Sequence, residues 1–355
     1  MTRSSENVVR PGIAAMRLYS SNREPCAIDL SDNTNQRGAP PSARAMVPET
    51  NVDLFARYPN HYAADLKRSI ATYLGVGTDE IVTGCGSDDV LDSAIRAFAK
   101  PDGAIAYPDP TFVMIPYCGQ VNDLALRPVP LLGADRGWDV DADGLLAQRA
   151  CITYVCSPNN PTGTRASAEA IERIVAEAEG VVLLDEAYIE YCGGSFVQRA
   201  KDAGRLLVIR TFSKAFGLAG ARVGYAIGAP ELVAAVEISR GPYKVTSLAE
   251  RVAVAAVEKD SAWVEGGIRD VVEARTRFVA FLERRGLKPI PSEANFVLVP
   301  VKDAAAQTKA LRERGVAVRP FPKLAGFGDA VRISVAPWEI MERALPSFEE
   351  VLSCV

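Results

Sequence analysis

The stretch LLVIRTFSKAFGLAGARVGY, residues 206–225, combines a buried strand with a group of reactive side chains. Its first four residues are apolar on both faces, which is typical of a strand inside a parallel sheet. The next residues place one amine, Lys214, beside the hydroxyls of Thr211 and Ser213, and Arg222 follows. Hydroxyl and guanidinium groups bind phosphate, and a lysine amine condenses with a carbonyl group to form a Schiff base. The stretch therefore predicts a site for a phosphorylated aldehyde.

The composition of the chain is that of a soluble globular protein. It has 355 residues, of which 48% are hydrophobic and 24% charged, so one large or two coupled domains are expected. A formal net charge of -4 without a long basic block argues against nucleic acid as a partner. No apolar run approaches the roughly 18 residues that span a bilayer, and the first residues lack the apolar core of a signal peptide. We expect a cytoplasmic protein without membrane partners.

The residue inventory excludes several common catalytic centres. His61 is the only histidine, which argues against Ser-His-Asp and Cys-His catalysis. The seven cysteines form no repeating framework and are expected to be free thiols. With one histidine and scattered cysteines, we expect no metal site.

Strand-like and helix-like segments alternate from about residue 63. The expected strands are residues 81–83, 104–107, 151–156, 181–184 and 206–209, and the expected helices are residues 63–74, 90–99, 168–178 and 230–238. This alternation predicts an α/β domain, which we place at residues 50–248 and which has a mainly parallel sheet covered by helices.

The pattern changes after residue 248. A helical segment over residues 249–285, with an expected break at Gly266-Gly267, leads to three expected strands at residues 295–299, 316–319 and 331–335. Residues 1–49 are rich in proline and glycine and are expected to form an irregular arm that packs on this part. We assign residues 1–49 and 249–355 to one smaller, discontinuous α+β domain.

Four polar motifs each directly follow one of the expected strands. They are residues 84–89, 157–163, 185–188 and 211–214. Ligands of such sheets bind beyond the carboxyl ends of the strands. We therefore expect these motifs to meet in one crevice.

The motifs contain the groups that pyridoxal phosphate (PLP) requires. Asp185 ends a buried strand, and a carboxylate there can keep a ring nitrogen protonated, although a plain N-cap is the ordinary alternative. Asn160 and Tyr188 can reach the phenolic oxygen of the ring; taken alone they are a turn residue and a half-buried aromatic. Ser87 and Asp88 open a helix whose backbone N–H groups can bind phosphate, or else they only cap it.

The constellation resembles fold-type I PLP-dependent aminotransferases, and in particular the histidinol-phosphate aminotransferase branch. The resemblance covers residues 30–335 and is carried by Asn160-Pro-Thr-Gly, Asp185-Glu-Ala-Tyr188 and Ser213-Lys214-Ala-Phe-Gly-Leu-Ala-Gly with Arg222. It implies a large domain on a mainly parallel sheet, a smaller α+β domain and a homodimer with shared active sites.

The resemblance also implies roles for the cofactor-binding residues. Lys214 forms the Schiff base and moves the proton, Asp185 pairs with the pyridinium, and Asn160 and Tyr188 hold the phenolic oxygen. Phe112 stacks on the ring, although a lone phenylalanine is more often core. The phosphate is held by Ser87, Asp88, Thr211, Ser213, Arg222 and, from the partner subunit, Tyr58, which could equally be an exposed turn residue.

The implied substrate site lies on the smaller domain and the arm. Arg332 matches an arginine that binds the acidic group of the substrate, which suits its bidentate fork. Arg319 assists or makes a surface salt bridge, and Asn295 and Asn33 lie near the substrate. The arm departs from the family pattern, because Thr34, Gln36 and Arg37 stand where an acid, a proline and an aromatic residue are usual.

We expect an aminotransferase that exchanges an amino group between an amine, with histidinol phosphate favoured, and 2-oxoglutarate or glutamate by a ping-pong mechanism. An aromatic amino-acid aminotransferase and a PLP decarboxylase of the threonine-phosphate type share these motifs. A regulatory protein that senses PLP is the non-enzymatic alternative, but the arm has no helix-turn-helix pattern.

Overall fold

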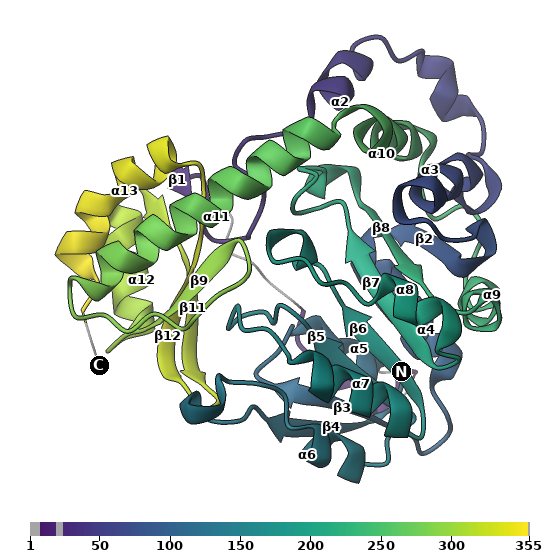
Figure 1. Cartoon of the computed structure of the whole chain (residues 1–355), viewed down its shortest axis with the longest axis horizontal. Coiled ribbons are helices and arrows are strands. Elements are labelled where there is room, and N and C mark those ends of the chain that lie inside the picture. Colours follow the sequence, from purple (N-terminus) through teal and green to yellow (C-terminus); the bar gives the residue numbers. More distant parts are fainter. Residues whose placement is uncertain (1–7, 19–23, 354–355) are drawn as a thin grey trace, which may run out of the picture.

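The computed structural model describes residues 8–18 and 24–353, and its largest element is a seven-stranded sheet (Figure 1). The strand order is β2-β8-β7-β6-β5-β3-β4, and only β8 runs antiparallel to its neighbours. The strands are β2 Ile81–Cys85, β3 Ala104–Asp109, β4 Ala125–Pro130, β5 Ile152–Cys156, β6 Val181–Asp185, β7 Leu206–Thr211 and β8 Val223–Ile227. The predicted mainly parallel sheet is confirmed, but the sequence analysis had not assigned β4 and β8.

Helices cover both faces of this sheet, because successive strand residues point to opposite sides. Leu183 belongs to the apolar cluster under α4 Gly86–Phe98, α5 Met114–Val121 and α9 Pro230–Ile238. Leu184 belongs to the cluster of the other face. That face carries α3 Ala64–Leu74, α6 Ala142–Ala147, α7 Ala168–Glu177, α8 Val197–Asp202 and α10 Ser247–Lys259. Short 3₁₀ turns are η2 Val52–Ala56, η3 His61–Ala63, η4 Thr78–Glu80, η5 Ala134–Arg136, η6 Ile189–Tyr191 and η7 Ala219–Ala221.

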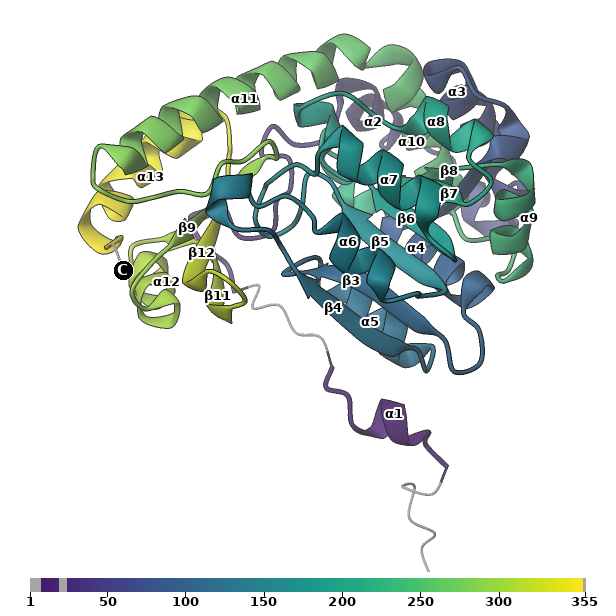
Figure 2. The ribbon, with the colours of Figure 1, turned by 60° about the horizontal axis from the view of Figure 1, so that its bottom comes forward.

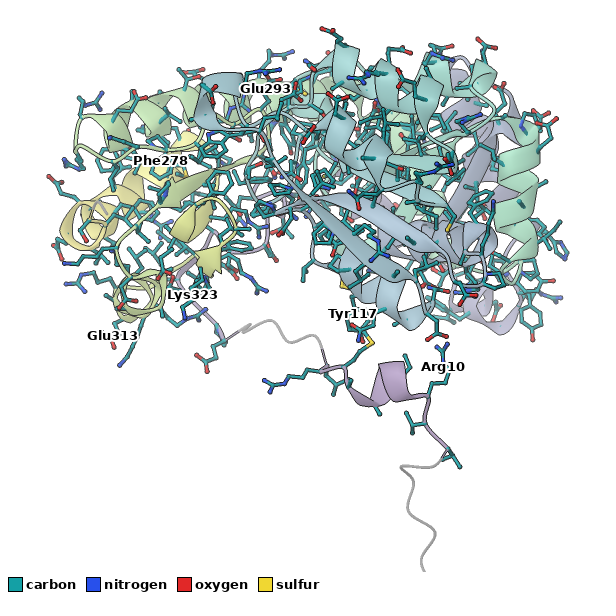
Figure 3. The ribbon with its side chains drawn as sticks, turned by 90° about the horizontal axis from the view of Figure 1, so that it is seen from below. Arg10, Tyr117, Phe278, Glu293, Glu313 and Lys323 are labelled. Carbon is teal, nitrogen blue, oxygen red and sulfur yellow. The ribbon has the colours of Figure 1, made fainter. Side chains whose placement is uncertain are left out.

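The smaller domain has an antiparallel sheet of order β11-β12-β9, built from β9 Phe296–Pro300, β11 Arg319–Leu324 and β12 Gly328–Ser334. Its helices are α11 Ser261–Glu283, α12 Ala304–Glu313 and α13 Trp338–Val351. Phe278 of α11 and Phe348 of α13 are fully buried and in ring contact, and Figure 3 labels Phe278 in this core.

The single strand predicted at residues 316–319 is wrong. β10 Val316–Ala317 pairs in parallel with β1 Ile28–Asp29, whereas β11 begins at Arg319 and pairs with β12. Val318 separates the two strands and is buried. The chain thus changes sheets within an apolar run, which a pattern of hydrophobicity cannot reveal.

The helix break predicted at Gly266-Gly267 is also wrong. The interruption lies at Asp260, between α10 and α11, and α11 runs without a break from the large to the smaller domain (Figure 2). The glycines make room for Arg37, whose Nη1 would lie 3.0 Å from a Cβ on Gly267. The Arg37 guanidinium lies 5.2 Å from the centre of the Trp263 ring and donates to the Trp263 carbonyl oxygen at 3.1 Å.

The arm packs on both domains. β1 pairs with the smaller domain as predicted, but α1 Pro11–Ala14 lies beside α5 of the large domain. Arg10 donates to the Val121 carbonyl oxygen at 2.7 Å and pairs with Asp123; Figure 3 labels Arg10 in this part of the arm. α2 Pro41–Met46 packs on α10, which in turn packs on α3. The domain boundaries at residues 50 and 248 stay a prediction.

Six of the seven cysteines lie within the described residues and are free thiols, whereas Cys354 lies outside them. Among the described helices, none combines the length and apolar character that crossing a membrane requires.

Candidate active site

Lys214 lies in the loop after β7, and its amine faces the arm and the end of the sheet. Nζ donates to the Asp32 carbonyl oxygen at 3.3 Å and lies 5.7 Å from the centre of the Tyr188 ring. Burial lowers the pKa of this amine to about 8, and the positive charge of Arg332 acts in the same direction. About a tenth of the amine is therefore neutral at pH 7, and the neutral form is the one that attacks a carbonyl carbon.

Asp185 ends β6 and is buried in the sheet. Its Oδ2 accepts a hydrogen bond from the Tyr154 hydroxyl at 2.8 Å, and its Oδ1 accepts from the Ala187 backbone N–H at 3.0 Å. Burial raises the pKa of the carboxyl to about 6, and these two hydrogen bonds oppose the rise. The carboxylate is thus held in a fixed orientation and is ionised at neutral pH.

Tyr188 and Asn33 form a buried hydrogen-bonded pair. Asn33 Nδ2 donates to the Tyr188 hydroxyl oxygen at 3.2 Å, while its Oδ1 accepts from the Ser334 hydroxyl at 3.0 Å. Asn33 has a φ of 59°, and Asn295 Nδ2 donates to its carbonyl oxygen at 3.0 Å. Asn295 therefore holds the backbone of the arm rather than facing the amine of Lys214.

Arg332 links three parts of the chain at this site. Nη1 donates to Asn160 Oδ1 at 2.6 Å, after β5, and Nη2 donates to the Ser31 carbonyl oxygen of the arm at 2.8 Å. Arg332 itself is on β12 and is buried. Arg319 lies opposite Arg332 in the β11–β12 pairing and is half-buried. Directly paired residues point to the same face of a sheet, so both guanidinium groups belong to one face.

Ser87, Asp88, Thr211 and Arg222, four of the residues predicted to bind phosphate, lie at or beside the start of α4. Gly224 of β8 lies opposite Thr211 of β7, and an added Cβ on Gly224 would lie 2.2 Å from the Ser87 backbone nitrogen. The Thr211 hydroxyl donates to the Ser213 hydroxyl at 2.9 Å. The helix start therefore touches the strand that follows the Lys214 loop.

Arg222 lies beside the same helix start. Its Nη2 lies 3.3 Å from Asp88 Oδ2, and its φ of 55° is left-handed. Because a carboxylate repels phosphate, the part of Asp88 that can bind phosphate is its backbone N–H. Arg222 and the first N–H groups of α4 form an electropositive end.

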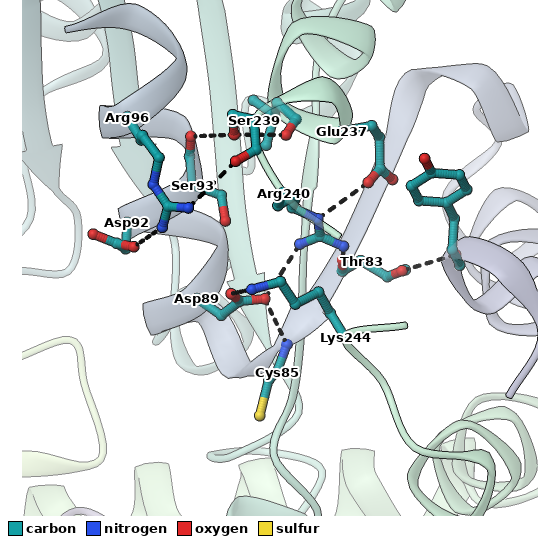
Figure 4. A network of polar contacts seen from close by, with 12 residues as sticks. Thr83, Cys85, Asp89, Asp92, Ser93, Arg96, Glu237, Ser239, Arg240 and Lys244 are labelled. Atoms are coloured by element: carbon teal, nitrogen blue, oxygen red, sulfur yellow. Dashed lines mark hydrogen bonds and ion pairs between the residues drawn. The ribbon is translucent and has the colours of Figure 1, made fainter. Parts of the chain in front are cut away.

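A network of charges fixes the beginning of α4 (Figure 4). Asp89 Oδ2 accepts from the Cys85 backbone N–H at 3.0 Å and lies 3.3 Å from Arg240 Nη1. Asp89 Oδ1 lies 3.1 Å from Lys244 Nζ, and Arg240 also pairs with Glu237 at 3.1 Å. The buried Arg240 donates to the Thr83 carbonyl oxygen as well. The helix start is thereby tied to β2 and to the segment after α9.

The contacts of Phe112 and Tyr58, two further predicted residues, are with other parts of the chain. Phe112 is half-buried and packs against the apolar cluster under α4. Tyr58 is 82% exposed and stacks on Tyr243 with ring centres 4.8 Å apart, while the Tyr243 hydroxyl lies 2.8 Å from His61 Nε2. Most of the Tyr58 side chain is therefore open to solvent in the single chain.

Sequence reasoning missed Tyr154, Ser334 and the carbonyl groups of Ser31 and Asp32. Tyr154 had only part of a signal: it lies two residues before Cys156 on β5, but the position of Cys156 opposite Asp185 comes from the register of the structure. Residues at a spacing of two share a face of a strand, which places Tyr154 on the side of Asp185. Backbone carbonyls carry no such signal.

The chain was compared with known proteins and structures. The sequence profile described as "Aminotransferase class I and II" matches residues 26–346. Histidinol-phosphate aminotransferase of Thermoanaerobacter sp. is 32% identical over 98% of this chain and 99% of its own length. The enzyme of the same name from Desulfitobacterium hafniense is 33% identical over 98% of both. The crystal structure of histidinol-phosphate aminotransferase from Sinorhizobium meliloti in complex with pyridoxal-5'-phosphate gives a TM-score of 0.85, with 26% identity and 97% of each chain covered.

Proposed function

The chain belongs to the class I and II aminotransferases and is a PLP-dependent enzyme, and from that premise we propose that it moves the amino group of histidinol phosphate to 2-oxoglutarate. The observation that carries this proposal is the convergence on Lys214. Its amine contacts the Asp32 carbonyl oxygen of the arm and lies 5.7 Å from the centre of the Tyr188 ring, and Arg332 joins the same arm to Asn160. The relatives named above are called histidinol-phosphate aminotransferases over nearly the full length of this chain.

The residues around Lys214 fit PLP chemically. The close approach of Gly224 to Ser87 leaves the backbone of the α4 start free of side chains, as a phosphate requires. Arg222 supplies a positive charge beside this start. Asp185 supplies a buried carboxylate for a ring nitrogen, and Lys214 supplies a desolvated amine.

When bound, PLP supplies an aldehyde that condenses with amines and a protonated ring that takes up negative charge from the substrate Cα. In the proposed roles, Lys214 binds the aldehyde and takes the proton from Cα when the substrate amine has displaced it. A positioned base of this kind contributes about 10²–10⁴-fold to the rate.

Asn160 and Tyr188 are proposed to donate to the phenolic oxygen of the ring. Because Asn160 Oδ1 accepts from Arg332, the free part of its amide is the donating NH₂ group. The Tyr188 hydroxyl oxygen accepts from Asn33, which leaves the hydroxyl proton available for donation. Both side chains thus present hydrogen-bond donors. Phe112 is proposed to cover one face of the ring.

Arg332 is proposed to bind the acidic group of the amino donor and of the acceptor in turn. The hydrogen bonds of its Nη1 and Nη2 go to neutral oxygens, and a carboxylate or phosphate accepts such bonds more strongly. Arg319, on the same face of the sheet, is proposed to assist, and Asn33 and Asn295 are proposed to shape the entrance.

The unusual arm residues are compatible with histidinol phosphate as the substrate. The Thr34 hydroxyl donates to Asp32 Oδ1 at 2.7 Å, and Gln36 Nε2 donates to the Asp29 carbonyl oxygen at 3.0 Å. Arg37 packs on α11 as described above. Their side chains therefore bind the arm to itself and to α11.

An aromatic amino acid is the second candidate substrate. The ring centres of Phe296 and Phe321 lie 5.4 Å and 5.6 Å from the Arg332 guanidinium carbon. Apolar rings beside a carboxylate-binding arginine favour a substrate with an aromatic side chain.

A panel of amines tests the proposal. The holoenzyme and its Lys214→Ala variant are incubated with 2-oxoglutarate and histidinol phosphate, histidinol, phenylalanine or tyrosine, and glutamate formation is measured. We expect the highest kcat/KM for histidinol phosphate, a large loss for histidinol, and no turnover by the variant. A preference for phenylalanine or tyrosine would assign the second candidate, and carbon dioxide release from threonine phosphate would indicate a decarboxylase.

The active enzyme is proposed to be a homodimer. Val47, Val52 and Phe55 are 52%, 75% and 67% exposed, in the same short segment as Tyr58. A groove of about 630 Å³, lined mainly by apolar side chains of this segment, the η7 turn and α10, lies beside them. Exposed apolar patches of this kind mark interfaces, and a partner covering this one places Tyr58 at a neighbouring site.

A further inference from the structure

Tyr154 is a buried tyrosine with a specific polar contact in an apolar environment. It is fully buried and belongs to the apolar cluster between the sheet and α4. Its hydroxyl donates to Asp185 Oδ2 at 2.8 Å. A buried hydroxyl group without a partner would cost free energy, and the hydrogen bond to Asp185 removes this cost.

The strand register explains why Tyr154 reaches Asp185. β5 and β6 are parallel neighbours, with Cys156 opposite Asp185 and Tyr154 opposite Leu183. Tyr154 is therefore the diagonal neighbour of Asp185 on the same face, within reach of a long side chain. Since the Ala187 N–H binds the other carboxylate oxygen, both oxygens are oriented and each retains acceptor capacity.

The hydrogen bond affects where a shared proton resides. A carboxylate facing a pyridine nitrogen shares one proton with it, and the proton stays on the stronger base. Burial makes Asp185 a stronger base, which pulls the proton toward the carboxyl group. A hydroxyl group that donates to the ionised carboxylate makes it a weaker base and so opposes the effect of burial.

We propose that Tyr154 is a positioning residue that keeps the shared proton on the ring nitrogen of PLP instead of on Asp185. The inference rests on the proposed placement of that nitrogen at Asp185. Tyr154 touches neither the substrate nor the reacting atoms in this role. It acts through Asp185 alone, by one hydrogen bond.

The test uses holoenzyme loaded with PLP that is ¹⁵N-labelled in the ring, because the ¹⁵N chemical shift reports protonation of that nitrogen. Wild type, Tyr154→Phe, Tyr107→Phe and Asp185→Asn are compared at one pH. Tyr107 is the matched control, since it is a buried tyrosine of β3 in the same apolar cluster. Circular dichroism and thermal unfolding establish that each variant is folded.

We expect wild type and Tyr107→Phe to give the signal of a protonated ring, and Tyr154→Phe to move toward the unprotonated range. In the amino-transfer assay Tyr154→Phe is expected to lower kcat about tenfold or more, the effect of one hydrogen bond to a charged group, with little change in KM. An unchanged ¹⁵N signal in Tyr154→Phe, with a shifted signal in Asp185→Asn, would refute the role of Tyr154 alone. An unchanged signal in Asp185→Asn would instead refute the proposed placement of the ring.

A second variant covers the case in which Tyr154→Phe does not fold. Site-specific replacement of Tyr154 by p-aminophenylalanine keeps the shape and a donor, but an aniline N–H is a weaker donor than a phenol. A partial shift toward the unprotonated range is expected, and no shift would overturn the inference.

Discussion

Burial makes the two ionisable groups of the proposed site less charged than they are in water. The pKa of Lys214 falls to about 8 and that of Asp185 rises to about 6, each mainly because the charged form is desolvated. The amine becomes a usable nucleophile, while the carboxyl group is still ionised at neutral pH. Both required forms, the neutral amine and the ionised carboxyl group, are therefore populated together most fully above about pH 8.

The first prediction concerns capture of PLP by the cofactor-free protein. Because the neutral amine is the nucleophile, the rate constant of capture should rise about tenfold per pH unit below pH 8 and level off above it. Stopped-flow absorbance after mixing with PLP measures this rate. Lys214→Arg, which keeps a charge but cannot condense, serves as the control and should show no such phase. A midpoint near the ordinary lysine value would contradict the burial effect.

The second prediction concerns the stability of the cofactor-free protein. The pKa of Asp185 is raised from 3.8 to about 6, so the folded state binds more protons than the unfolded state in this range. Its contribution to the free energy of unfolding therefore falls as pH rises from about 4 to 6, and is constant above. The Asp185→Asn variant lacks this dependence. As pH rises from about 4 to 6, the free energy of unfolding of the variant minus that of the wild type should therefore rise by on the order of 2–3 kcal/mol. Urea unfolding of both proteins at several pH values measures this difference. A difference that does not change with pH would argue against a raised pKa of Asp185.

The proposed catalytic residues could be predicted from sequence because each belongs to a motif at a strand end. Lys214 and Asn160 follow β7 and β5, Asp185 ends β6, and the parallel order of these strands brings their carboxyl ends to one edge of the sheet. Tyr154 could not be predicted in the same way, because an aromatic residue inside an apolar strand is ordinarily core. Its contact with Asp185 depends on the register of β5 and β6, which sequence alone does not define.

At the scale of elements, the contact between β8 and the start of α4 decides whether phosphate can approach. A Cβ on Gly224 would lie 2.2 Å from the Ser87 nitrogen and 2.4 Å from the Gly86 carbonyl carbon. Both contacts are with backbone, which cannot move aside without shifting the helix or the strand. The helix start is also tied down by Asp89 and Arg240.

The third prediction follows from this contact. Gly224→Ala should raise the Kd of PLP at least about tenfold and lower the free energy of unfolding by about 1–3 kcal/mol, because it overpacks the contact. Gly204→Ala is the matched control, since nothing lies within 4 Å of its added Cβ. It should change stability by no more than about 0.5 kcal/mol. Fluorescence titration with PLP and urea unfolding measure the two quantities, and equal effects of both variants would contradict the prediction.

The mistaken elements show where local pattern fails. Glycines interrupt a helix by default, yet Gly266 and Gly267 lie inside α11 because Arg37, distant in sequence, packs there. The apolar run at residues 316–319 belongs to two sheets, because its first two residues pair with β1 and its last residue pairs with β12. In both cases a long-range contact overrides a local preference.

At the scale of the whole molecule, Tyr58 and the apolar side chains of the segment around it are largely exposed in the single chain. The proposed homodimer gives both a partner, and it makes each active site depend on two chains. A surface that is covered in this way also protects the arm, whose α2 packs on α10 beside the groove.

The fourth prediction tests this shared site with mixed dimers. Tyr58→Ala and Lys214→Ala should each reduce activity in the homodimer. A dimer that combines one subunit of each kind should regain about half of the wild-type activity, because one of its two sites then has both residues intact. Dimers purified through two different tags are assayed, and light scattering gives their mass. No regain of activity would mean that Tyr58 acts within its own chain or not at all.

The loop that carries Lys214 begins at the end of β7 and ends at the start of β8, and these two strands are paired neighbours. Thr211 and Gly224 are register partners, and the Phe212 N–H donates to the Val223 carbonyl oxygen at 3.1 Å. Inserting or deleting a residue in this loop would displace the amine by roughly 3.3–3.6 Å, the length of one residue. Such a displacement exceeds the reach of bond formation, so we expect an insertion or deletion in this loop to abolish condensation at the amine. Side-chain substitutions in the arm and in β11 leave the length of this loop unaltered, and they are the expected route to a changed substrate preference.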